Sequence, residues 1–251
     1  MNLSNPSIHS KPEAQIGSWL NQKNLYLLTA ESCTGGLIGD LITNIPGSSD
    51  YYLGGVITYS NQSKINLLGV QRTTLDQFGA VSRETVIEMA RGVRELFSST
   101  AQGRQVIGLS ISGIAGPGGG TPQKPVGFVW IAISSPEGEW AWQIQGHGNR
   151  TENKIFSAQQ ALSKLMGVLI GSESAEIVQV VTRPSSTGDE IPTRIIWRDK
   201  DFLITDIGRH WRDKNGEHWL VMNANRQTAQ LTRLISGIWS ISIHASPTQN
   251  A

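Results

Sequence analysis

The sequence predicts an α/β domain, a three-layer sandwich with a mixed sheet, followed by a small all-β domain. Up to about residue 171, apolar runs typical of strands alternate with apolar residues at helical spacing. Beyond that point only strand patterns and turn signals remain. We therefore expect the first domain over residues 1–171, a linker over 172–192 and the all-β module over 193–251.

The elements of the first domain follow from apolar spacing, capping residues and turn residues. Residues 1–9 are expected to be a disordered leader. Ser82, with Glu84 in the first turn, and Thr151 are suitable N-caps. In order, we expect a helix from Pro12, a strand over 25–28, a helix over 37–45, a strand over 55–59, a short helix through 65–68, a helix from Ser82 to Phe97, a strand over 106–112, a hairpin of strands 126–134 and 140–145, and a helix from Thr151 to Leu169.

The C-terminal module is expected to be a small curled sheet or barrel. Its candidate strands cover 193–197, 202–207, 218–222, 229–234 and 238–243, with turn signals at Asn215-Gly216 and Ser236-Gly237. Residues 177–181, inside the expected linker, are a further candidate strand. A unit of about 60 residues is only marginally stable by itself, so the module is expected to dock on the first domain or on a second subunit of a homo-oligomer.

Composition excludes several classes of protein. The formal net charge is +1, so no charge surplus indicates nucleic acid or an anionic membrane as a partner. The first residues lack the apolar core of a signal peptide and no apolar stretch could span a bilayer, so we expect a cytoplasmic protein. The single cysteine, Cys33, excludes an internal disulfide, and the five histidines lack metal-ligand spacing. With no phosphate-loop or dinucleotide motif either, we expect neither a metal nor a cofactor.

Four of the eight tryptophans fall in the C-terminal module, where arginines are interleaved with them. Such a pattern can stack on nucleobases. From Glu176 onward, however, nine Lys and Arg face eight Asp and Glu, whereas nucleic-acid binders usually carry a clear basic surplus. We therefore favour tryptophans in the module's core over a nucleic-acid surface.

Chemistry is most plausible in the stretch Thr29–Gly36, which lies between a predicted strand and a predicted helix. It carries two candidate nucleophiles, Ser32 and Cys33. The plainer interpretation is a tight turn with Thr34 as N-cap. Tyr59 and Lys64 follow the next predicted strand, where a base for the nucleophile is expected. A lysine acts as a base only if its pKa is lowered, and the alternative is a solvated helix lysine.

Several short motifs follow one another along residues 12–170. They are Ala30-Glu31-Ser32-Cys33-Thr34-Gly35-Gly36, Pro46-Gly47-Ser48-Ser49, Thr58-Tyr59-Ser60-Asn61 with Lys64, Gly79-Ala80-Val81-Ser82, Ser112-Gly113-Ile114-Ala115-Gly116-Pro117, Gly119-Gly120, Lys124-Pro125-Val126-Gly127, and Gly148 with Arg150. By their order and spacing, residues 12–170 resemble the CinA C-terminal domain family, whose stand-alone members are nicotinamide mononucleotide deamidases. In two places the chain departs from the family pattern: Gly118 stands at an often acidic position, and Lys154 replaces a second arginine.

The resemblance implies hydrolysis of the carboxamide of nicotinamide mononucleotide to nicotinic acid mononucleotide and ammonia, in pyridine nucleotide recycling and without a metal. It assigns Ser32 as the nucleophile, Lys64 as its general base and Tyr59 as their neighbour in the polar cluster. Cys33 as a thiol nucleophile is the nearest alternative. From a different class, the chain could be a non-catalytic nucleotide-sensing or interaction protein that uses the β module.

Substrate contacts are expected from two glycine-rich segments. Backbone amides of Thr34, Gly35 and Gly36 are candidates for holding the oxyanion of the reaction. Arg150 and the loop Gly113–Gly120 are candidates for the phosphate, because a guanidinium and bare amides suit that anion. Within the loop, the expected contacts are Gly113, Gly116 and Gly119.

Overall fold

The computed structural model describes residues 12–96, 103–171, 176–185, 189–197, 200–213, 216–234 and 239–243. The chain forms two compact units, one over residues 11–169 and the other including residues 170–251. The expected leader 1–9, Phe97, Asn215 and the turn at 236–237 lie outside the described residues. No helix in the described ranges is long and apolar enough to cross a membrane.

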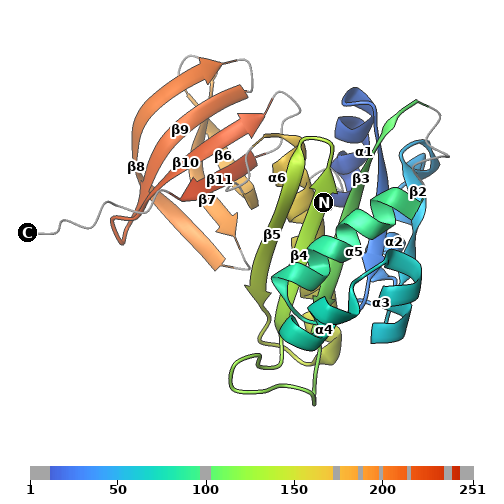
Figure 1. Cartoon of the computed structure of the whole chain (residues 1–251). Coiled ribbons are helices and arrows are strands. Elements are labelled where there is room, and N and C mark those ends of the chain that lie inside the picture. The colour runs from blue at the N-terminus through green and yellow to red at the C-terminus, as the bar shows by residue number, and fades with distance from the viewer. Residues whose placement is uncertain are drawn as a thin grey trace, which may run out of the picture. The chain divides into compact units, whose positions relative to one another are not determined.

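The first unit is a five-stranded mixed sheet with helices on both faces (Figure 1), which confirms the predicted three layers. The strand order is β2-β1-β3-β4-β5; β1 pairs in parallel with β2 and β3, and β3, β4 and β5 pair antiparallel. Helices α1, α2 and α6 form one layer, and α3, α4 and α5 the other. The bounds are α1 Pro12–Gln22, β1 Leu25–Glu31, α2 Leu37–Thr43, the 3₁₀ turn η2 Ser48–Asp50, β2 Tyr52–Ile57, α3 Asn61–Leu68, α4 Arg72–Phe78, α5 Arg83–Leu96, β3 Gln105–Gly113, β4 Phe128–Ser135, β5 Gly138–Gln145 and α6 Arg150–Leu169.

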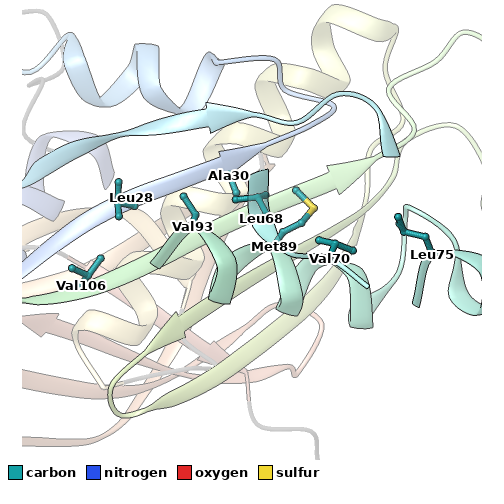
Figure 2. Packing of buried hydrophobic residues seen from close by; sticks show 8 residues of the cluster. All are labelled: Leu28, Ala30, Leu68, Val70, Leu75, Met89, Val93 and Val106. Atoms are coloured by element: carbon teal, nitrogen blue, oxygen red, sulfur yellow. The ribbon is translucent and has the colours of Figure 1, made fainter. Parts of the chain in front are cut away.

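The central strand β1 is buried on both faces, as expected of a parallel strand between two helical layers. Leu28 and Ala30 point toward α5 and pack in a cluster with its Met89 and Val93 (Figure 2). Helix α5 lies close to the sheet: a Cβ at Gly108 of β3 would stand 2.2 Å from the carbonyl oxygen of Ala90. The packing of β1 in this core therefore fixes the position of the residues that follow its carboxyl end.

Two capping predictions for the first unit are wrong and one is confirmed. Ser82 does cap α5, because its Oγ accepts from the amide of Thr85. Helix α2 begins after Gly36, so Thr34 is not its N-cap. At α6 the amides of Thr151 and Glu152 both donate to Asn149 Oδ1, and the cap is therefore Asn149.

Other element boundaries also differ from the predictions. Helix α3 begins inside the polar run at 60–64, where Ser60 and Ser63 form a reciprocal capping box. Helix α4 was not predicted, since Leu75 is its only buried residue and gives no apolar period. The hairpin of β4 and β5 is confirmed.

The second unit is a closed barrel of six antiparallel strands in the order β10-β11-β6-β7-β8-β9. Its bounds are β6 Glu176–Pro184, β7 Glu190–Trp197, β8 Lys200–Asp213, β9 Gly216–Asn223, β10 Thr228–Leu234 and β11 Trp239–Ile243. The expected linker 172–192 therefore needs correction, because β6 and the start of β7 lie within it. The candidate strand over 177–181 is confirmed as part of β6, whose Val178 and Val180 pack into the barrel core.

Tryptophans of the barrel contribute to its interior. Trp219 and Trp239 are buried, with ring centroids 4.7 Å apart. Trp197 is half-buried beside Phe202. Trp211 stacks on the ring of His218. The interpretation of core tryptophans is confirmed for Trp219 and Trp239.

Candidate active site

The stretch after β1 lies at the carboxyl edge of the parallel strands, where ligands of open α/β sheets usually bind. The Ser32 amide donates to the carbonyl of Ile111 in β3 over 3.1 Å. On the other side, the Thr58 amide, just beyond β2, donates to the Glu31 carbonyl over 2.7 Å. Backbone hydrogen bonds to β3 and to the residue just after β2 therefore fix the position of Glu31, the last residue of β1, and of Ser32, which follows it.

Ser32 and Lys64 form a buried pair at this edge. Lys64 Nζ lies 2.9 Å from Ser32 Oγ and 2.6 Å from the Thr58 carbonyl oxygen. Only 1% of Lys64 and 7% of Ser32 is exposed. The capping box of α3 starts the helix at Asn61 and so directs Lys64 inward. The alternative of a solvated lysine is wrong.

The environment of Lys64 favours its neutral amine. Both of its hydrogen-bond acceptors are uncharged oxygens, one hydroxyl and one carbonyl. Burial lowers the pKa of Lys64 from its ordinary 10.5 to about 8, against a smaller opposing effect of Cys33. At neutral pH a sizeable minority of molecules therefore carries an amine that can accept a proton.

Cys33 lies next to Ser32 but in a setting that favours the thiol. Its side chain is 6% exposed, and burial raises its pKa to about 12. The thiolate is the reactive form of cysteine, so an environment that keeps the thiol protonated makes Cys33 a poor nucleophile.

Glu31 is a site residue that sequence reasoning missed. It is 2% exposed, and its carboxyl oxygens accept from the amides of Gly36, Ile38 and Gly39 over 2.9, 3.1 and 2.9 Å. The expectation that the Gly36 amide holds an oxyanion therefore needs correction, because Glu31 already occupies that donor. Gly35 is different: its amide has no acceptor within the described part of the chain, and its φ is +65°.

Tyr59, Arg150 and the glycine loop meet at the rim of the site. Arg150 Nη2 donates to Tyr59 Oη over 3.0 Å, and Nη1 donates to the Gly116 carbonyl over 2.6 Å. Tyr59 is 65% exposed, and its only hydrogen bond in the described part of the chain is the one to Arg150. Tyr59 therefore belongs with the arginine rather than with the buried pair.

Two of the loop glycines have packing roles. A Cβ at Gly113 would stand 2.4 Å from Val129 Cγ2, and one at Gly116 would stand 2.5 Å from Val126 Cγ1. Gly116 also has a φ of +92°. Gly119 has a φ of +85° and more space, with Ile114 3.7 Å from its Cβ position.

Asn153 and Lys154, near the start of α6, are further site residues. The buried Asn153 donates to the carbonyls of Ala115 and Gly148 over 3.1 and 2.8 Å, which ties the loop to the helix. Lys154 Nζ lies 3.7 Å from the Cβ position of Gly35, so it faces the turn that holds Ser32. In the sequence, Lys154 stands where the family pattern has a second arginine, one helical turn after Arg150.

Taken together, fold and site define a three-layer α/β protein with a buried serine–lysine pair and a basic rim. Within the described parts of the chain, no three His, Cys, Asp or Glu side chains gather so that they could hold a metal ion. The model of the CinA C-terminal domain matches residues 9–169. The chain belongs to this family.

Known relatives and structures agree with this assignment. The chain is 47% identical over 155 residues to a CinA-like protein of Desulforapulum autotrophicum and 45% identical over 158 residues to one of Gloeothece citriformis, matching 61% and 62% of this chain. These matches cover 35% and 36% of those relatives, so the chain spans about a third of their length.

Solved structures show the same fold. Competence/damage-inducible protein CihA of Agrobacterium tumefaciens has a TM-score of 0.58 and 37% identity, over 67% of this chain and 99% of that one. A CinA superfamily protein of Escherichia coli has a TM-score of 0.58 and 26% identity, over 67% of this chain and 94% of that one.

Proposed function

We propose that this chain hydrolyses the carboxamide of nicotinamide mononucleotide, giving nicotinic acid mononucleotide and ammonia for pyridine nucleotide recycling. The observation that carries the proposal is the buried Lys64 amine, 2.9 Å from Ser32 Oγ and with a pKa lowered to about 8. A serine hydroxyl needs a base at this distance before it can attack an amide. Membership in the CinA C-terminal domain family supports the substrate class.

The chemical steps follow from this pair. Lys64 Nζ takes the proton of Ser32 Oγ as the oxygen forms a bond to the amide carbon. When the C–N bond breaks, protonated Lys64 gives that proton to the nitrogen, which leaves as ammonia. Water then attacks the acyl-serine ester with Lys64 again as base, and the acid and free Ser32 are released.

The oxyanion formed in these steps needs hydrogen-bond donors other than the amides at the N-terminus of α2, because three of those amides already donate to the Glu31 carboxyl group. The amides of Thr34 and Gly35 are the remaining backbone candidates. Two buried hydroxyls, Thr34 Oγ1 and Thr58 Oγ1, have no hydrogen-bond partner in the described part of the chain. Since buried polar groups are seldom left unpaired, we assign these hydroxyls to a bound substrate or an ordered water.

Side chains rather than helix amides are proposed to hold the phosphate. At the start of α6, Asn149 Oδ1 already accepts from the amides of Thr151 and Glu152. Arg150 and Lys154 lie one turn apart, so both project from the same face of α6. Lys154 has no ion-pair partner among the described residues, and Tyr59 orients the Arg150 guanidinium.

The test is ammonia release from nicotinamide mononucleotide by the purified chain. We expect Ser32→Ala and Lys64→Ala to lose activity by at least about a thousandfold. The exposed residues Ser18 and Lys23 provide matched controls, and Ser18→Ala and Lys23→Ala should retain full activity. Unchanged circular dichroism would show that the inactive variants fold. Wild-type activity in either site variant, or binding of the mononucleotide with no turnover, would contradict the proposal; the second result would support a nucleotide-sensing protein.

A further inference from the structure

The β-barrel contains a cavity of about 310 Å³ that the proposed reaction does not use. Strands β7, β8, β9 and β10 supply most of its wall, and β11 contributes Ile241. The apolar lining includes Ile195, Trp197, Phe202, Ile204, Val221 and Ile241. None of the described residues that line it carries a charge.

This cavity is partly open to solvent, so it is a pocket rather than an enclosed packing defect. Protein interiors are packed about as densely as organic crystals, and a water molecule takes roughly 30 Å³. Water filling a space of about 310 Å³ would find few polar partners on these walls. Its size falls at the lower end of ligand pockets, which are mostly apolar with a few polar groups.

Polar groups lie on one side, at the turn from β9 to β10. Asn223 is fixed there: its Oδ1 accepts from the amides of Asn225 and Gln227, and its Nδ2 donates to Gln227 Oε1 over 3.0 Å. These bonds leave Gln227 Nε2 without a partner in the described part of the chain. Thr228 adds a hydroxyl to the same edge.

We propose that the barrel binds an uncharged, planar aromatic molecule of one or two fused rings, with a hydrogen-bond acceptor at one edge. The rings of Trp197 and Phe202, with centroids 6.0 Å apart and planes 47° apart, provide aromatic contacts at the wall. Gln227 and Thr228 donate to the acceptor at the edge. A charged ligand is disfavoured because its charge would be desolvated with no countercharge among the described residues of the wall. This inference is independent of the proposed amidase activity.

Coumarin, an uncharged bicyclic ring with a carbonyl, is a suitable probe, and coumarin-3-carboxylate is its charged counterpart. The full chain with labelled isoleucine methyl groups is titrated with each compound and followed by NMR. We expect saturable shifts at Ile195, Ile204 and Ile241 with coumarin, and affinity for the carboxylate weaker by about tenfold or more. Gln227→Ala should weaken coumarin binding by about threefold to tenfold.

Adjacent residues of β8 offer a matched pair of variants. Ile204 lines the cavity, whereas Leu203 is 58% exposed and does not contribute to its lining. Ile204→Trp should fill the space and weaken coumarin binding by at least about tenfold, while Leu203→Trp should leave it unchanged. Spectra of the unliganded variants show whether the barrel is folded.

Three results would overturn the inference. They are the absence of saturable shifts up to millimolar coumarin, equal weakening by both tryptophan variants, and shifts that track protein concentration. The last result would show that a second copy of the chain fills the cavity.

Discussion

If Lys64 is the general base, only its neutral form can start the reaction, and the rate must follow its titration. Burial lowers the pKa of Lys64 from 10.5 to about 8, so kcat/KM should rise about tenfold per pH unit up to about pH 8 and level off above it. At pH 7 about one molecule in eleven would carry the neutral amine, against about one in three thousand for an unperturbed lysine. The buried environment would thus increase the reactive fraction by about three hundredfold.

The assay is ammonia release from nicotinamide mononucleotide between pH 6 and pH 9.5 at constant ionic strength. A matched variant is Lys64→Arg, which keeps the positive charge but cannot give it up at these pH values. It should lose at least about a thousandfold in kcat/KM. A flat profile, a midpoint near the pKa of a free lysine, or an active arginine variant would each refute the assignment of Lys64 as base.

Four further predictions follow from the same contacts. Since the folded state favours neutral Lys64, the unfolding free energy of the wild type relative to Lys64→Met should rise by about 2 kcal/mol from pH 7 to pH 9.5 in urea titrations. Cys33→Ala should keep at least about half of the activity, measured by ammonia release, because the thiol is buried and protonated. Gly116→Ala should destabilise the domain by about 2 to 4 kcal/mol in urea, given the φ of +92° and the contact with Val126. Glu31→Gln can keep at most part of its three amide bonds, so kcat should fall about tenfold or more with KM little changed, while Glu31→Asp should restore part of the rate.

The sheet, the barrel and the motifs of the site could be predicted from the sequence, because the spacing of apolar residues and the turn residues are local signals. The sequence indicated residues 177–181 as a candidate strand, but not the full length of β6 or its place in the barrel, because the inward valines of β6 form a core only once β7 and β11 pair with it. It could not show that Lys64 is buried either. That property depends on the capping box at Ser60, which turns a polar run into the first turn of α3.

One backbone amide, that of Gly36, was assigned to the wrong task for the same reason. A glycine-rich turn before a helix predicts free amides for an anion, but only tertiary structure shows which of them are free. At α2 the Glu31 carboxyl takes three, and at α6 Asn149 takes two. With both helix termini occupied by the chain's own side chains, the terminal amides rigidify the walls of the site. We therefore propose that recognition of an anionic substrate rests on the side chains of Arg150 and Lys154 at the rim of the site.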